Sequence, residues 1–192
     1  MPIEFKMTGK FTVIFFFAIV AAAFLGVVSG QYFNHLKAEK ARAKVLAENP
    51  PISLKAGDLI PNYSFVNLDG TAQGLYQQLG YDKGIILVMS SSCGFCAQEV
   101  EKWKGEFATL PAGVKMIGIA NDPVGKMSKY CLEKSVSFPI LCDSTGKFFE
   151  QNQVKSYPIV LLVGQDKRIS KLHFGFDPKR RVSDYLKTLA MN

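Results

Sequence analysis

The hydrophobic positions near the start of the chain form one long block. From Phe11 to Val28 there is no charged residue, and the run FTVIFFFAIVAAAFLGVV is apolar almost throughout. At about 1.5 Å per residue, a helix of this run is roughly 27 Å long, close to the hydrocarbon thickness of a bilayer. Residues 31–48 are rich in Ala, Lys, Glu and Leu, which favour helix, and Asn49-Pro50-Pro51 then stops it. The predicted segments are a tail (1–10), an anchor (11–30) and a helical stalk with a proline linker (31–56).

The remainder, residues 57–192, has a different pattern in which short apolar runs alternate with helix-like stretches. Continuous runs such as IILVM are typical of strands that are covered on both faces. Asp69-Gly70 is a turn signal, and Asp177-Pro178 offers a cap and a first-turn proline for a last helix. The predicted strands cover 63–67, 85–89, 114–120, 159–163 and 168–174, and the predicted helices cover about 94–108 and 124–134. The alternation predicts one α/β domain with helices on both faces of a sheet.

The first apolar block has a second interpretation as a cleaved signal peptide. Lys6 and Lys10 precede it, and residues 28–30 (VSG) resemble a small-residue cleavage site. We favour an uncleaved anchor because the apolar run from Phe11 to Val28 is longer than the core of 7 to 15 residues that is usual in signal peptides. Basic residues also follow the block, between Lys37 and Lys44, so the positive-inside rule alone would keep the domain in the cytoplasm. A large C-terminal domain can nevertheless cross the membrane regardless of nearby charge.

The charge pattern gives no indication of a nucleic-acid partner. The formal net charge is +7, but basic and acidic residues are interspersed, and the dense run 179–181 has no nucleic-acid motif beside it. A chain of 192 residues is long enough for one domain with a substantial core, so we expect one active site. We expect no cofactor and no metal.

The candidate chemistry lies in the sequence SSSCGFCAQEVEKW, directly after the apolar run IILVM. Cys96, Val100, Trp103 and Phe107 recur at helical spacing, which predicts that Cys96 faces the sheet and that Cys93 lies at the helix tip. The free N–H groups and positive end of a helix favour the thiolate, so Cys93 is the predicted attacking thiol. Cys96, one turn away, is the predicted resolving thiol.

Four other kinds of cysteine site are alternatives to a redox dithiol. A zinc site would need Cys131 and Cys142, but zinc sites usually bring a second closely spaced pair. A copper carrier of the Sco type uses a longer spacing between its cysteines. A peroxiredoxin-type thiol peroxidase places one nucleophilic cysteine in a similar setting, and Ser90 stands at the matching offset, but the expected proline is missing. An inert structural disulfide is the fourth alternative.

The motif CGFC, the order strand, motif, helix, and the later SYPIVLLV resemble the thioredoxin superfamily, and in particular its membrane-anchored TlpA/ResA-type branch with a redoxin-like domain. The resemblance covers roughly residues 57–190 and implies the thioredoxin fold, a central mixed sheet with helices on both faces. Ser92 stands where the branch usually has Trp, and Phe95 where Pro is common. These departures leave the redox direction open.

The resemblance also implies roles for several residues. Pro158 would be cis and lie against the dithiol, and Tyr157 would receive the substrate chain together with Gly94 and Phe95. Glu99 matches the family's glutamate that tunes or relays the proton of the pair; its alternative interpretation is a carboxylate on the helix surface. The implied activity is thiol-disulfide exchange of reductase type with protein clients, for example in cytochrome c maturation, and a redox partner would recycle the dithiol.

Cys131 and Cys142 are either two packed thiols or a second disulfide. A disulfide would indicate an oxidising compartment and contribute about 2 to 4 kcal/mol. We expect a single-pass protein of the cytoplasmic membrane, bound to lipid through residues 11–28, whose catalytic domain faces the periplasmic side. His173 has no partner in the pattern and receives no catalytic role.

Overall fold

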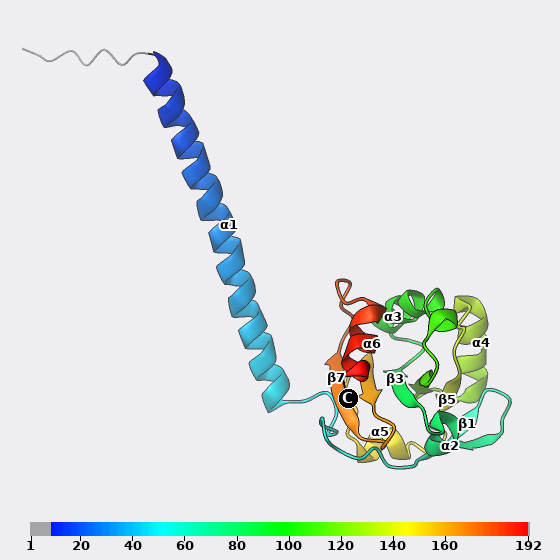
Figure 1. Ribbon diagram of the computed structural model, residues 1–192. Helices are drawn as coiled ribbons and strands as arrows, with labels where there is room; N and C mark the ends of the chain where they lie inside the picture. The colour runs from blue at the N-terminus through cyan, green and yellow to red at the C-terminus, as the bar shows by residue number, and fades with distance from the viewer. Residues whose placement is uncertain (1–8, 192) are drawn as a thin grey trace, which may run out of the picture. The chain divides into compact units, whose positions relative to one another are not determined.

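A computed structural model describes residues 9–191; within this range the side chains of 9–16, 18, 42, 43 and 47 are not described. The chain divides into two compact units, the first up to Pro50 and the second from Pro51 onward (Figure 1). The first eight residues of the predicted tail, Lys6 among them, lie outside the described residues.

The first unit is a single helix, α1 (Gly9–Glu48), of 40 residues. At about 1.5 Å per residue it is roughly 60 Å long, about twice the thickness of a bilayer core. Its segment Ile19–Leu46 is long and apolar enough to cross a membrane. A signal sequence would meet the same criteria of length and composition. The predicted anchor, residues 11–30, overlaps this segment over residues 19–30. The predicted stalk does not form a separate helix, because Ser29 and Gly30 continue the helical backbone without a break.

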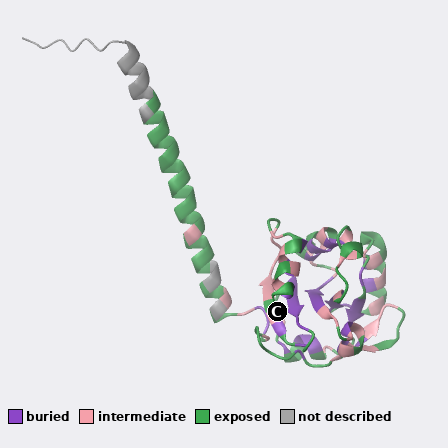
Figure 2. Ribbon diagram, in the orientation of Figure 1, coloured by how far each residue is buried: buried purple, intermediate pink, exposed green. Residues whose placement is uncertain are grey.

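The second unit is built on a mixed sheet in the order β2-β1-β5-β4-β3-β6-β7. The central strands β5, β4 and β3 are parallel, whereas β1, β2, β6 and β7 join the sheet through antiparallel pairs. The strands are β1 (Ser64–Asn67), β2 (Ala72–Gly74), β3 (Lys83–Met89), β4 (Val114–Ala120), β5 (Ile140–Cys142), β6 (Ile159–Val163) and β7 (Ile169–Phe174). Every residue of β6, and all but the first of β3, is buried, as the continuous apolar runs predict (Figure 2).

Helices cover both faces of this sheet. One face carries α3 (Gly94–Lys104), α4 (Val124–Lys134) and α6 (Val182–Ala190), which share a core with β3 residues such as Leu87. The other face carries α2 (Leu75–Leu79) and α5 (Lys147–Gln151), which pack on the alternate β3 residues such as Val88. A short 3-10 turn, η1 (Phe107–Thr109), follows α3. The arrangement is the mixed sheet with helices on both faces that the sequence predicts.

Two boundaries differ from the predictions. The domain starts before residue 57, because Ile52 is buried in the core and Ser53 N–H donates to the carbonyl of Asn152 at 2.8 Å. The last helix does not start at Asp177-Pro178. The carboxylate of Asp177 instead accepts the N–H of Lys179 at 2.9 Å and closes a turn, and α6 begins only at Val182.

Candidate active site

The strand register brings three loops to one edge of the sheet. Met89 at the end of β3 pairs with Ala120 at the end of the parallel β4, and Val88 pairs with Ile159 at the start of the antiparallel β6. The segments that follow β3 and β4 and the segment that precedes β6 therefore meet at this edge. They carry Cys93, Asp122 and the Tyr157-Pro158 pair.

The two cysteines of CGFC form a disulfide, with their Cα atoms 5.2 Å apart. Cys93 is the N-cap residue of α3, and its sulfur accepts the backbone N–H of Cys96 at 3.1 Å. Cys93 is half-buried, Cys96 is 0% exposed, and Gly94 and Phe95 between them are exposed, Phe95 at 61%. A sulfur at the N-cap lies where free N–H groups stabilise a thiolate, and Cys93 is the residue of the pair that is open to solvent.

The helix face predicted from the sequence packs on the sheet. Cys96, Val100 and Trp103 are all at most 1% exposed. Phe107 also contacts this core, but from η1, because α3 ends at Lys104. Periodicity alone thus placed the first three of these residues correctly.

Residues 157 and 158 border the same edge. The Tyr157-Pro158 peptide bond is cis, as the resemblance implies, and Pro158 is buried. Tyr157 is half-buried, and its hydroxyl accepts the side-chain amide of Asn121 at 3.5 Å. Its ring lies edge-on to Phe149, which fixes the side chain from the α5 side.

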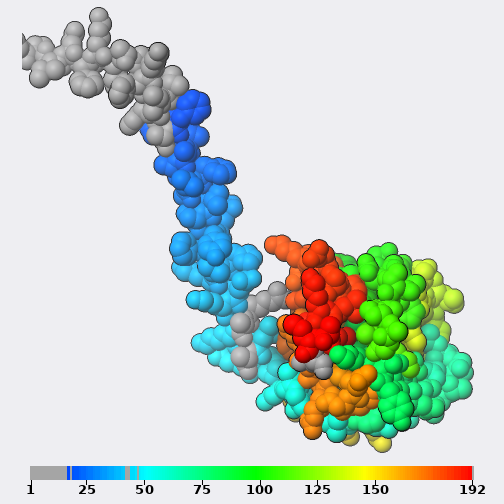
Figure 3. Space-filling model, in the orientation of Figure 1, coloured from blue at the N-terminus to red at the C-terminus, as the bar shows by residue number. Residues whose placement is uncertain are grey.

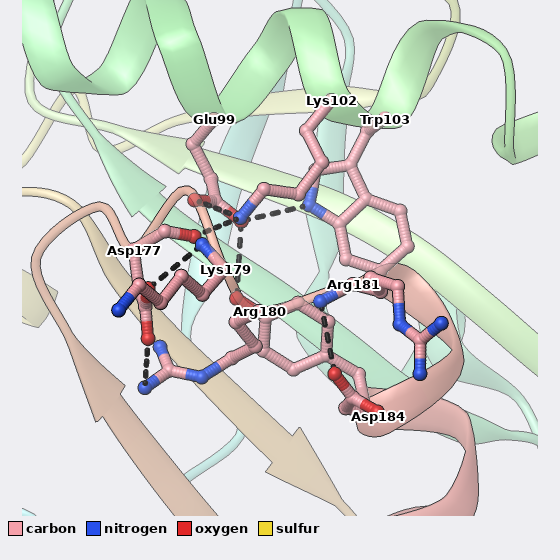
Figure 4. A network of polar contacts seen from close by, with 9 residues as sticks. Glu99, Lys102, Trp103, Asp177, Lys179, Arg180, Arg181 and Asp184 are labelled. Atoms are coloured by element: carbon pink, nitrogen blue, oxygen red, sulfur yellow. Dashed lines mark hydrogen bonds and ion pairs between the residues drawn. The ribbon is translucent and has the colours of Figure 1, made fainter. Parts of the chain in front are cut away.

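Glu99 is a buried carboxylate, which rules out the surface interpretation. It is 1% exposed and forms an ion pair with Lys102 at 3.0 Å (Figure 4). The indole N–H of Trp103 and the hydroxyl of Tyr185 also donate to it, at 3.3 and 3.1 Å. Lys102 in turn donates to the backbone carbonyl of Asp177 at 3.2 Å. The carboxylate therefore has donors from α3 and from α6, two elements that lie side by side in Figure 3.

Tyr185 and its neighbour His173 are both neutral at pH 7 in this environment. Burial, followed by the charge of Glu99, raises the pKa of Tyr185 above its ordinary value. Burial and the nearby charge of Arg180 lower the pKa of His173 to about 4. The His173 ring packs edge-on against Tyr185 at 5.1 Å, so its place is structural.

Cys131 and Cys142 are free thiols in the structure, so the second disulfide is not formed. Cys142 is fully buried on β5 and Cys131 is half-buried on α4. Burial raises the pKa of each to about 11, and the charge of Cys142 adds to the rise at Cys131. Both are therefore protonated and unreactive at neutral pH.

Three residues of the site escaped the sequence reasoning: Lys102, Asp122 and Tyr185. Asp122 is 7% exposed and accepts both the N–H and the hydroxyl of Ser91, at 2.7 and 2.8 Å. A signal existed for Asp122, because a carboxylate directly after an apolar parallel strand lies at the sheet edge where the dithiol lies. Nothing local marked Tyr185, which is 86 positions from the carboxylate that it contacts.

Comparison with known proteins places this geometry in a family. The model of the Redoxin family matches residues 55–189. The chain belongs to the redoxin family. It is a thioredoxin-like thiol-disulfide oxidoreductase, as the family and one curated relative, ResA, indicate.

Individual relatives of this redoxin are distant. ResA of Halalkalibacterium halodurans, named a thiol-disulfide oxidoreductase, is 25% identical over 70% of this chain and 77% of its own length. A Mycobacterium tuberculosis protein named as a peroxiredoxin is 27% identical over 69% of this chain and 85% of its own length. A Chlorobium tepidum structure titled as a thiol:disulfide interchange protein DsbE has a TM-score of 0.61 at 22% identity, over 72% of this chain and 97% of that one. This last likeness shows that the fold is shared.

Proposed function

We propose that this redoxin is tethered to a membrane by α1 and exchanges disulfides with extracytoplasmic protein clients through Cys93 and Cys96. The observation that carries the proposal is the asymmetry of the pair: Cys93 is half-buried at the helix tip, whereas Cys96 is 0% exposed behind it. A client disulfide has access to the first sulfur only. Cys93 is thus the attacking group, and Cys96 can react only with a sulfur already bonded to Cys93.

The reaction proceeds in two balanced exchanges. The Cys93 thiolate attacks one sulfur of a client disulfide, forms a mixed disulfide and releases the other client sulfur as a thiolate. Cys96 then loses its proton, attacks the Cys93 sulfur and releases the second client thiolate. The client gains two electrons and two protons, and the protein is left with the Cys93–Cys96 disulfide. A redox partner must return two electrons before the next cycle.

Glu99 serves in this scheme as a fixed negative charge one helical turn beyond Cys96. Its carboxylate accepts four hydrogen bonds: Oε1 accepts from Lys102, Trp103 and Tyr185, and Oε2 accepts from Lys102. A buried anion near a thiol disfavours the thiolate, so we propose that Glu99 tunes the cysteine pair from behind Cys96.

Client contact falls to the residues around the exposed sulfur. Phe95 offers an exposed apolar ring inside the motif, and Tyr157 and Pro158 border the same edge of the sheet. We propose that these residues and Gly94 receive the client chain. A reductase-type role in protein maturation, including cytochrome c maturation, is the version that the TlpA/ResA resemblance favours.

Trapping of clients tests the proposal. The full chain is expressed in membranes with Cys96→Ser, and proteins disulfide-linked to Cys93 are separated and identified. We expect this variant to accumulate mixed disulfides and Cys93→Ser to accumulate none. Cys142→Ser is the control, because it removes a thiol from the same core without touching the motif. Equal trapping by the Cys93→Ser and Cys96→Ser variants would contradict the assigned roles.

A thiol peroxidase is the second candidate, because one group of relatives is named as peroxiredoxins. In that reaction the Cys93 thiolate attacks one peroxide oxygen, the O–O bond breaks and the other oxygen leaves as water or an alcohol. The resulting sulfenic acid is resolved by Cys96, which forms the disulfide with loss of water. Peroxide consumption by the reduced protein, measured beside reduction of a protein disulfide, separates the two. Fast turnover of peroxide with no disulfide reduction would favour the peroxidase.

A further inference from the structure

Asp122 is a buried carboxylate that the scheme above does not use. It lies just after β4 and is 7% exposed. Its oxygens accept the N–H of Ser91 at 2.7 Å and the Ser91 hydroxyl at 2.8 Å, and Lys126 Nζ lies 2.8 Å away. Hydrogen bonds to an ionised carboxylate are short and are stronger than those between neutral groups. Asp122 thus accepts two hydrogen bonds from one residue, Ser91, of the loop that follows β3.

That loop ends at Cys93. Ser91 stands two residues before it, and Cys93 N–H donates to the carbonyl of Ser90 at 3.2 Å, which closes a turn. The hydroxyls of Ser90 and Ser92 lie 3.1 Å apart. A turn of three serines has little side-chain surface to pack. The two bonds to Asp122 therefore tie the turn to the segment after β4, in addition to the bonds within the turn itself.

The charge on Asp122 has one cationic partner among the described groups that contact it. Although burial opposes ionisation, the hydrogen bonds from Lys126 and Ser91 lower the pKa of Asp122. Its charge also acts on Tyr130 on α4 and Cys142 on β5, and the carboxylate of Asp143 lines the same hollow. Burial is the main reason why the pKa of Tyr130 and the pKa of Cys142 are raised, and both of these groups are neutral at pH 7. Lys126 on α4 is therefore the group that offsets the anion.

We propose that Asp122 is a positioning residue for Cys93: it holds the serine turn through Ser91, and its ion pair with Lys126 balances the charge beside the dithiol. The inference rests on the proposed function, in which Cys93 is the attacking thiol. It concerns the loop that presents this thiol and not the groups that react.

Two substitutions that break the same ion pair test the charge part. Asp122→Asn removes the anion and keeps an oxygen that can accept the Ser91 N–H, whereas Lys126→Met leaves the anion unbalanced. In the reduced full chain in detergent, the rate of Cys93 alkylation is followed against pH and the label is located by mass spectrometry. The expected midpoint falls by about half a unit in Asp122→Asn and rises by about half a unit in Lys126→Met, each roughly a threefold change in thiolate fraction below the midpoint. A purely structural role would move both midpoints the same way.

Ser91→Ala tests the positioning part without changing any charge. It removes one of the two bonds to Asp122, which loosens the Cys93 sulfur relative to Cys96. The equilibrium constant for closing the disulfide against glutathione should fall by about twofold to threefold, because a looser pair has a lower effective concentration. An unchanged equilibrium constant would overturn the positioning part.

Asp143 supplies the matched control. It is also a buried carboxylate at the end of a strand, 6% exposed, but it accepts the N–H of Phe149 at 3.1 Å and so holds α5 and not the dithiol turn. Asp143→Asn should leave the alkylation midpoint unchanged. A shift there equal to that of Asp122→Asn, or shifts of the same sign in Asp122→Asn and Lys126→Met, would overturn the inference and leave the proposed function standing. A wild-type midpoint at the value of an ordinary thiol would overturn both.

Discussion

Replacing Lys102 with methionine tests the buried network under α3. The Glu99 side chain is 1% exposed and that of Lys102 is 14% exposed, so their ion pair lies almost entirely out of water. Removing one partner of a buried pair costs about 3 to 5 kcal/mol, because the other charge stays buried without compensation. Glu99 keeps its bonds to Trp103 and Tyr185, so we expect a loss of about 2 to 3 kcal/mol in the free energy of unfolding.

The double variant Glu99→Gln with Lys102→Met removes both charges. Because no uncompensated charge remains, it should be at least about 1 kcal/mol more stable than Lys102→Met alone. Lys104→Met is the matched control on the same helix. Its pair with Glu101, at 2.8 Å, is exposed, with side chains 29% and 70% accessible, and should change stability by less than about 0.5 kcal/mol.

The chain carries its own reporter for this measurement. Trp103 is the one tryptophan of the sequence, and it donates to Glu99 and stacks on Tyr185 with ring centres 5.4 Å apart. Guanidinium chloride titration of the full chain in detergent, followed by tryptophan fluorescence, therefore reports on the domain alone. A cost below about 1 kcal/mol for Lys102→Met, or a double variant less stable than the single one, would refute the reasoning.

Three further predictions follow from single sites. His173 has a pKa of about 4 when folded against 6.5 as a free side chain, so the unfolded chain binds more protons between these values and stability should fall as pH drops from 6.5 towards 4; His173→Gln should flatten this dependence in thermal melts. Iodoacetamide at pH 7 should leave Cys131 and Cys142 unlabelled in the native oxidised protein and label both after unfolding, whereas a second disulfide would give no label in either state. A Cβ at Gly118 would clash with the Ile140 side chain, so Gly118→Ala should lower the melting temperature. An unchanged melting temperature would show that Ile140 on β5 moves aside without cost.

Local patterns sufficed for the elements that carry the dithiol. The runs Val114–Ala120 and Ile159–Val163 are β4 and β6 with the predicted bounds, and α4 spans Val124–Lys134 as predicted. In each case the signal is the burial of consecutive or periodic side chains, which a short stretch of sequence expresses in full. The same reasoning placed Cys93 at the tip of α3 and Cys96 on its buried face.

Local patterns failed where one carboxylate can accept hydrogen bonds in either of two backbone geometries. Asp177 before Pro178 reads as a helix cap, yet its carboxylate closes a turn with Lys179, and α6 starts five residues later at Val182. A carboxylate followed by free N–H groups satisfies either geometry, and the packing of α6 decides between them. Asparagine and proline residues at 49–51 did mark the end of α1, because proline excludes the helix whatever surrounds it.

The sequence by itself determined that one strand-turn-helix unit presents a cysteine pair, because hydrophobic periodicity and helix-end chemistry act within about 20 residues. Only the tertiary structure decided what surrounds that pair. Glu99 is buried because Tyr185 meets it from 86 positions away, and the turn before Cys93 is held by Asp122 from 31 positions beyond Ser91. Such contacts depend on which strands lie side by side, and the order of strands in the sheet is a property of the whole chain.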